Sequence, residues 1–205
     1  MARTSRRSKA DAVLRLIRSD HRTVNELLRA FKRTDGERHR QAIVLTLCKE
    51  LNAHALLEEE LFYPALRSVA RDGEVGEAYV EHSVVKGLVQ KLEGMQPDEP
   101  YYEASVKVLG DLVEHHVDEE EDELFDLARR SQEDLQALAI LMQERRAQLR
   151  QAQGLPQEAG EVIGLDEAAR EAMLLGPGSK VPGMAGTVVN KLSNVVKGAM
   201  PRGRH

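Results

Sequence analysis

Histidine and glutamate side chains occur in this chain at a spacing that suits a metal site. Two histidines are each followed four positions later by glutamate: His54 by Glu58, and His116 by Glu120. Four residues make about one turn of helix, so each imidazole and its carboxylate project from the same side, roughly 5–6 Å apart at Cβ. Imidazole together with carboxylate suits iron or manganese. Each pair can therefore hold one side of a metal centre.

Two further histidines, His21 and His82, stand in other segments of helical pattern. All four imidazoles share the apolar stripe of their segment; His21, for example, is in register with Ile17 and Val24. One such histidine alone is most often a core imidazole with a hydrogen-bond partner. Six residues together, including two glutamates with no Lys or Arg on the same stripe, favour bound cations, because an unpaired buried charge is costly.

The segments that carry these residues have the periodicity of amphipathic helices. Turn sequences rich in Gly, Asp and Pro separate them, and Pro64 is expected to disturb the second helix. Short connections make consecutive helices antiparallel, so the sequence predicts an all-α fold, an up-down-up-down four-helix bundle. The helices are expected at about residues 9–31, 37–71, 76–93 and 101–128.

An additional C-terminal helix is expected after the bundle. Ser131 and Asp134 form a capping-box-like start, and apolar residues at helical spacing continue to about Ala152. We expect this helix to pack outside the bundle, followed by a partly flexible tail. The predicted organisation is a basic N-terminal arm (1–9), the bundle (10–130), the accessory helix (131–153), and a linker with a basic amphipathic tail (154–205).

Composition excludes several classes of protein. A single cysteine, Cys48, allows neither an intrachain disulfide nor a thiolate cluster for zinc. No charge-free apolar run approaches the roughly 18 residues that a membrane span needs, and the first residues lack the apolar core of a secretory signal. The net charge is −5, with basic residues concentrated at both ends of the chain. We therefore expect a soluble cytoplasmic protein.

Four stretches of the sequence resemble a known family, the hemerythrin-like or HHE cation-binding domain. They are SDHRTVNELL around His21, HALLEEELFYPAL from His54, EHSVVKGLVQKL around His82, and HHVDEEEDELF from His115. The resemblance covers about residues 10–130. It implies a non-haem, carboxylate-bridged pair of iron ions, with manganese as the alternative metal. The metal ligands would be His21, His54, Glu58, His82, His116 and Glu120.

A local ambiguity concerns His115 and His116, because both have glutamate four positions later. When the two HxxxE segments are aligned with each other, Phe125 corresponds to Tyr63, and His116 then corresponds to the histidine of the first segment. His115 falls at the margin of the apolar stripe. The alignment therefore favours His116 as the ligand.

One departure from the oxygen-carrying members of that family affects the predicted chemistry. They have an additional histidine one turn from the ligand of the third helix, whereas this chain has Ala78 and Lys86 on either side of His82. Coordination positions are left for water, for a small ligand, or for a nearby group. The nearby candidates are Glu59, Glu81 and His115.

The leading functional hypothesis is a protein that binds or senses O₂, NO, or iron and redox state. No nucleophile-and-base arrangement or phosphate loop points to an organic substrate. The alternative is a di-iron enzyme acting on peroxide or NO, catalase-like, peroxidase-like or NO-reducing, because open positions on redox-active iron permit turnover.

The tail carries a separate hypothesis. Residues 187–200 form an amphipathic pattern that suits peripheral contact with a membrane or a partner protein. The basic residues at the start of the chain lack an aromatic platform or a recognition motif, so nucleic acid is not expected as a partner.

Overall fold

Helices account for the regular structure of the computed structural model, and no strand occurs among the residues it describes. These are residues 2–71, 73–131 and 133–157, with the backbone alone for residues 2–11. The elements, in chain order, are α1 (Ala2–Arg33), α2 (Glu37–Leu57), the π-helical segment η1 (Glu58–Phe62), α3 (Tyr63–Leu66), α4 (Glu74–Glu93), α5 (Tyr102–Glu119), the π-helical segment η2 (Glu120–Leu124), α6 (Phe125–Arg130) and α7 (Leu135–Ala152).

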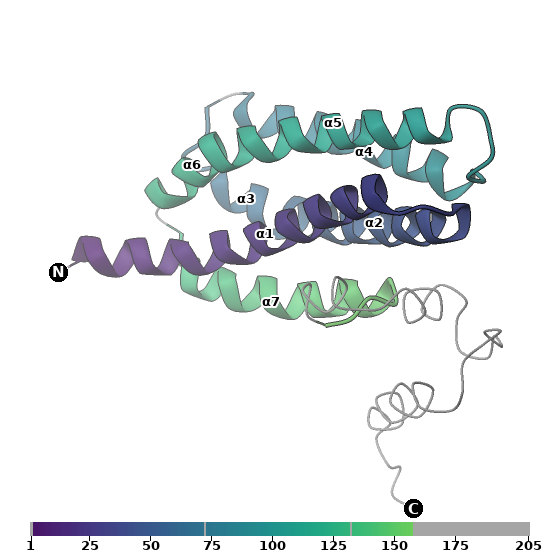
Figure 1. Cartoon of the computed structure of the whole chain (residues 1–205). Coiled ribbons are helices and arrows are strands. Elements are labelled where there is room, and N and C mark those ends of the chain that lie inside the picture. The colour runs from purple at the N-terminus through teal and green to yellow at the C-terminus, as the bar shows by residue number, and fades with distance from the viewer. Residues whose placement is uncertain (1, 72, 132, 158–205) are drawn as a thin grey trace, which may run out of the picture.

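The prediction of an all-α up-down-up-down bundle is confirmed. Helix α1 packs against α2, α2 against α4, and α4 against α5, while α6 returns to the side of α1. Figure 1 shows the four long helices running in alternating directions. The turns before α2 and α4 contain Gly36 (φ 93°) and Gly73 (φ 106°), a backbone region that favours glycine. These two glycines mark the helix starts that short antiparallel connections require.

The first helix is longer than predicted. It begins at Ala2, so the segment expected as an arm (residues 1–9) is helical from residue 2 onward. Residues 2–10 contain no glycine or proline, and their arginine, lysine and alanine favour helix. The helix therefore has no local signal that would delay its start.

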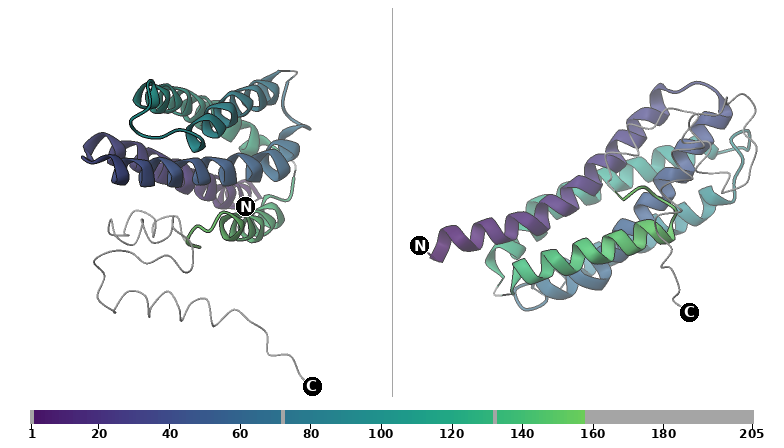
Figure 2. Two further views of the ribbon diagram at one scale, coloured as in Figure 1. Left: turned by 90° about the vertical axis from the view of Figure 1, so that its right-hand side faces the viewer. Right: turned by 90° about the horizontal axis from the view of Figure 1, so that it is seen from below.

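Helix α7 covers one side of the bundle by packing on α1 and α2. Figures 1 and 2 show it alongside these helices. Its N-cap is Asp134, whose side chain accepts hydrogen bonds from the backbone N–H groups of Gln136 (3.1 Å) and Ala137 (3.3 Å). The helix thus starts after Asp134 rather than at Ser131, because this carboxylate satisfies the free N–H groups of the first turn.

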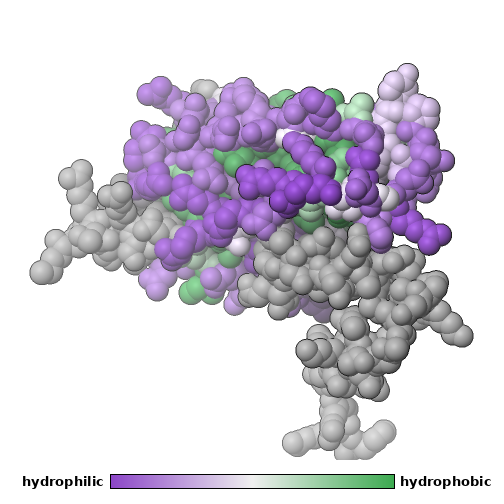
Figure 3. Space-filling model, viewed as in Figure 1, coloured by the Kyte–Doolittle hydropathy of each residue, from purple (hydrophilic) through white to green (hydrophobic). Residues whose placement is uncertain are grey.

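The apolar core consists of two clusters of buried residues, one toward each end of the bundle. On α1 one cluster ends at Ile17 and the other begins at Val24; on α4 the corresponding residues are Ala78 and Val85. His21 and His82 lie in these intervals, and His116 lies between Val113 of one cluster and Leu124 of the other. His54 directly follows Ala53, where α2 passes from one cluster to the other. The bundle therefore contains a polar layer between two apolar layers. On the coloured part of the face in Figure 3, hydrophilic residues predominate, and apolar residues show between them.

None of the helices within the described residues is long and apolar enough to cross a bilayer. Of the predicted linker and tail (154–205), only residues 154–157 are described, and the amphipathic segment 187–200 lies outside the described residues.

Candidate metal centre

Both HxxxE segments change from α-helix to π-helix at the glutamate that was predicted as a ligand. The backbone N–H of Tyr63 donates to the carbonyl of Glu58, and that of Phe125 donates to the carbonyl of Glu120, five residues earlier in each case. The sequence predicted a disturbance of the second helix at Pro64 and a continuous fourth helix. Pro64 follows only the first π segment, so proline is not the shared cause. Such π segments are frequent at functional sites, and here both begin at a buried glutamate.

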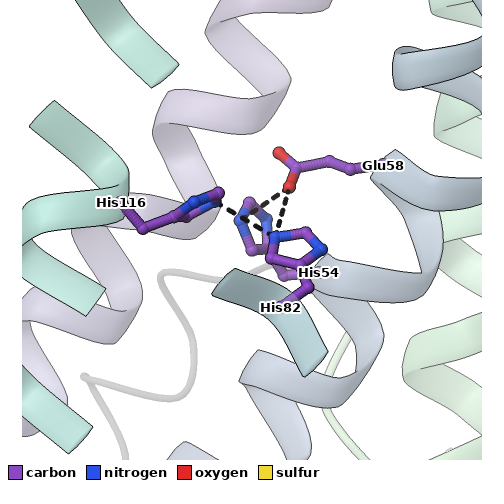
Figure 4. A group of neighbouring side chains, drawn as sticks. All are labelled: His54, Glu58, His82 and His116. Carbon is purple, nitrogen blue, oxygen red and sulfur yellow. Dashed lines mark hydrogen bonds and ion pairs between the residues drawn. The ribbon is translucent and has the colours of Figure 1, made fainter. Parts of the chain in front are cut away.

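The first glutamate lies between two histidines. Glu58 Oε2 is 3.2 Å from His54 Nε2 and 3.4 Å from His82 Nε2. His82 Nε2 is in turn 3.1 Å from His116 Nε2. Figure 4 shows these four side chains pointing toward one another from α2, η1, α4 and α5.

The remaining two predicted ligands complete the layer. His21 Nε2 lies 3.1 Å from Glu120 Oε2, and the His21 ring contacts the His54 ring edge-on at 4.9 Å between centroids. The fold therefore brings together all six residues that the sequence singled out. In each histidine, Nε2 is the inward nitrogen.

These six side chains are almost completely buried, with exposures from 0% for Glu58 to 6% for His54. Several of their polar atoms have no hydrogen-bond partner among the described residues. They are His21 Nε2, both ring nitrogens of His54, Glu58 Oε1, and both carboxylate oxygens of Glu120. Buried polar atoms without partners are rare and costly. Lone pairs of nitrogen and carboxylate oxygen facing one small volume are the donor set of a carboxylate-bridged metal pair, so the residues fit such a centre.

Three of the four imidazoles are held from outside by a carboxylate at Nδ1. A carboxylate on this nitrogen favours the tautomer with hydrogen on Nδ1, which leaves the Nε2 lone pair directed inward. The Nδ1 atoms of His21, His82 and His116 lie 2.9 Å from Glu121, 3.1 Å from Glu59 and 2.7 Å from Glu81, respectively. This is the arrangement that orients metal-binding histidines in proteins.

Glu59, Glu81 and His115, the nearby groups considered as extra ligands, therefore lie outside the buried layer. Glu59 and Glu81 lie on the outer side of the imidazoles, and Glu59 also accepts hydrogen bonds from Lys86 Nζ at 2.6 Å. The side chain of His115 is 60% exposed and does not enter the buried layer. The structure thus directs His116 inward and His115 outward, as the internal alignment favoured.

One residue at the centre was missed by the analysis of the sequence. The hydroxyl of Tyr63 lies 3.2 Å from Glu58 Oε2 and 3.2 Å from His82 Nε2. Tyr63 lies five positions after Glu58. This spacing exceeds one α-helical turn, so an α-helix would not place the two side chains on the same face. The π segment places them together. Phe125, which corresponds to Tyr63 in the other half, has no hydroxyl, so the two halves of the centre differ.

Burial and mutual repulsion shift the protonation of this layer in the metal-free chain. Burial and the charge of Glu120 raise the pKa of Glu58 well above its usual range. Burial and the neighbouring His116 lower the pKa of His82 to about 4, and burial with the other imidazoles lowers that of His54. Burial opposes charge on His21, yet Glu120 and Glu121 raise its pKa to about 9. Neutral imidazole is the form that binds metal, so His54 and His82 are in that form at neutral pH, whereas His21 has to release a proton when a metal binds.

A small cavity of about 20 Å³ adjoins the four imidazoles. Valine side chains from three helices form most of its remaining wall, so the space is apolar apart from the histidines. Its lining residues are His21, Val24, Leu51, His54, Ala55, His82, Val85, Val113, His116 and Val117. A volume of this size holds about one water-sized molecule.

Comparison with known proteins agrees with this arrangement. The family model described as hemerythrin HHE cation binding domain matches residues 12–128. The chain also resembles a solved structure, that of a hemerythrin HHE cation binding domain-containing protein from Mycobacterium kansasii, with a TM-score of 0.59 at 24% identity over 77% of this chain and 94% of the other. At that identity the likeness concerns the fold alone.

A curated protein is similar to about half of the chain. It is a DNA nickase from Nostoc sp., 36% identical over 110 residues, which are 54% of this chain and 31% of the relative. This chain therefore spans about a third of that protein's length, and the relative's name describes the longer protein.

Proposed function

Because the chain belongs to the family of hemerythrin HHE cation-binding domains, we propose that its buried layer holds two iron ions and that the resulting centre binds or senses O₂ or NO, or reports iron and redox state. Manganese is the alternative metal. The observation that supports this most directly is the convergence of Nε2 atoms and carboxylate oxygens that have no hydrogen-bond partner among the described residues.

The side chains fall into two overlapping groups, each compact enough to hold one ion. His54, Glu58, His82 and His116 form one group, and His21, His54, Glu58 and Glu120 form the other, with ligand atoms within 4.8 Å of one another in each. His54 and Glu58 belong to both groups. A carboxylate can bridge two ions, whereas the inward Nε2 of His54 can bind only one of them. A His-rich and carboxylate-rich donor set of this kind favours iron over zinc, which prefers four-coordinate sites.

The surroundings favour a small uncharged ligand. The cavity beside the imidazoles is about 20 Å³ and walled mainly by aliphatic side chains, so it suits a diatomic molecule and is too small for a nucleotide. Ala78 and Lys86 stand where a further histidine would occupy a coordination position. Bound ferrous iron would supply an open position and an electron to such a ligand.

The residues of the chain exclude bulk water from the centre and orient its imidazoles. The two apolar clusters on either side of the layer keep bulk water away, which strengthens electrostatic interactions inside it. The carboxylates of Glu59, Glu81 and Glu121 hold three imidazoles in place, and the Tyr63 hydroxyl holds a proton beside Glu58.

The second candidate function is an enzyme that acts on peroxide or NO. Tyr63 favours it, because a hydroxyl at the centre could donate a hydrogen bond to peroxide or NO held there. Stopped-flow mixing of the loaded protein with hydrogen peroxide distinguishes the two functions: many turnovers per centre support the enzyme, and a stable ligand complex supports the binding protein.

The proposal is tested by metal analysis of the purified chain together with visible spectra in the presence and absence of air. We expect iron in the protein and spectra that change with O₂ or NO. His54→Ala and His116→Ala should lose metal, whereas His39→Ala should retain it, because His39 lies outside the layer. Equal retention in all three variants would overturn the assignment.

Peripheral contact with a membrane or a protein through residues 187–200 is a separate proposal. It rests on the amphipathic pattern of that segment and its basic charge. Deletion of residues 177–205 should reduce binding to anionic vesicles or to a partner. Unchanged binding would remove this idea without affecting the metal centre.

A further inference from the structure

An acidic pocket opens between α4 and η2, beside His116. Six of the residues that line it are glutamates, and none is lysine or arginine. Its volume is about 20 Å³, enough for one water molecule or a small cation. The lining residues are Glu74, Glu77, Ala78, Glu81, His116, Glu119, Glu120, Glu123 and Leu124.

The pocket connects the surface to the buried layer. Glu77 and Glu123 are exposed at its outer side, whereas Glu120 is only 2% exposed. Neither carboxylate oxygen of Glu120 has a hydrogen-bond partner among the described residues, although His21 Nε2 lies 3.1 Å from one of them. A buried carboxylate without a hydrogen bond that also lines an acidic pocket indicates a position for a cation.

A second group of possible ligands lies at the outer side of the same pocket. His115 Nε2 is 3.2 Å from Glu119 Oε1 and 3.7 Å from Glu81 Oε1. These three residues each offer one ligand atom within 4.8 Å of the others, and His115 is exposed. One imidazole with two carboxylates is a donor set for a divalent cation that keeps some of its water.

Glu81 links this outer group to the centre. Its Oε1 faces His115 on the surface, and its Oε2 lies 2.7 Å from Nδ1 of the buried His116. The same carboxylate therefore belongs to the outer group and supports an imidazole of the inner layer. The outer and inner groups are adjacent rather than two unrelated sites.

We propose that this acidic pocket is the loading route by which a divalent cation reaches the buried centre, with Glu81, His115 and Glu119 as an outer transit site and Glu120 as the first inner ligand. The inference rests on the proposed metal centre and adds how the centre is filled. A cleft lined by charges of one sign raises the local concentration of counter-ions and their association rate.

The experiment uses the full chain, freed of metal by chelation, and Co²⁺ as the probe, because its visible absorption reports binding. Loading is followed by stopped flow, and the final metal content by elemental analysis. The test variant is Glu77→Gln/Glu123→Gln, which removes two exposed pocket charges and none of the proposed ligands. The matched control is Glu93→Gln/Asp98→Asn, which removes two exposed charges, one at the other end of α4 and one in the turn that follows it.

We expect the pocket variant to load about tenfold more slowly at low salt, with a smaller difference at high salt, because screening weakens steering. The control should load at the rate of the unchanged protein, and all should reach the same final metal content. Equal rates in the pocket variant and the control would overturn the loading route while leaving the metal centre intact. A lower final content in the pocket variant would also overturn it, because these residues would then hold the centre itself together.

The outer transit site is tested by how the loading rate depends on the Co²⁺ concentration. If the outer group binds the cation first, the loading rate of the unchanged protein should level off as the Co²⁺ concentration rises. His115→Ala/Glu119→Gln should load more slowly and show a rate that stays proportional to concentration, with the final content preserved. Saturation that persists in this variant would overturn the outer site. Failure of the unchanged protein to take up any Co²⁺ would overturn both the route and the proposed centre.

Discussion

Glu58 and Tyr63 are connected twice across a single π turn. The Tyr63 backbone N–H donates to the Glu58 carbonyl oxygen, and the Tyr63 hydroxyl donates to Glu58 Oε2 at 3.2 Å. An α-helical turn would direct residues five apart to different faces. The π turn therefore adds a hydroxyl to one half of the centre, while the equivalent Phe125 leaves the other half without one.

Tyr63→Phe makes the two halves alike. We expect it to destabilise the metal-free chain by about 1 kcal/mol, because a buried hydrogen bond to Glu58 is lost, and to retain metal, because all six proposed ligands remain. Urea unfolding and metal analysis measure the two effects. Tyr79→Phe is the control, since its hydroxyl donates to the Glu59 backbone carbonyl outside the layer. Loss of metal in Tyr63→Phe alone would show that the hydroxyl is itself needed for metal binding.

Glu121→Gln tests the carboxylates that hold the imidazoles from outside. The hydrogen bond from His21 and the neighbouring Arg18 lower the pKa of Glu121 to about 2, so this group is ionised at neutral pH. Replacing it with an amide should weaken metal affinity by about 10- to 100-fold, as measured by competition with a chelator. Asp122→Asn, the exposed neighbour, should leave affinity unchanged. Equal affinities in the two variants would contradict this role.

Arg150 connects α7 to the bundle. It is 1% exposed, and its guanidinium donates two hydrogen bonds to the buried carboxylate of Glu50 on α2. Arg150→Met should lower the free energy of unfolding by about 3–5 kcal/mol, because Glu50 is left buried without its partner. Glu50→Gln/Arg150→Met should recover part of that loss. A change below about 1 kcal/mol in urea unfolding would mean that α7 is not part of the cooperative unit.

Cys48 should make stability depend on alkaline pH. Burial raises the pKa of its thiol to about 12 in the folded chain, against 9.0 for the unperturbed group. Because the folded pKa is raised, the stabilising contribution is complete below pH 9 and is lost as pH rises toward 12. At pH 10 the loss is about 1 kcal/mol.

Cys48→Ala lacks this titration. The difference in unfolding free energy between the unchanged chain and Cys48→Ala should therefore be about 1 kcal/mol smaller at pH 10 than at pH 7.5. Urea unfolding at both pH values measures it. A difference that does not change with pH would mean that the thiol ionises as readily in the folded chain as in the unfolded one.

The sequence by itself determined the helical class, the antiparallel bundle and the six residues of the buried layer. Periodicity and short turns are local properties, and His21, His54, His82 and His116 lie on stripes that any helical packing would bury. The HxxxE spacing is likewise local, because its two residues are one helical turn apart. These features therefore needed no knowledge of distant contacts.

Only the tertiary structure decided how that layer is held. Glu121 supports His21 across 100 positions of sequence, and Glu81 supports His116 across 35, so no local pattern predicts either contact. The π turn that brings Tyr63 to Glu58 depends on a backbone register that helical spacing does not contain. The acidic pocket, too, exists only because α4 and η2 pack side by side. Long-range packing chooses the partners of each side chain, whereas local spacing chooses only the face on which it lies.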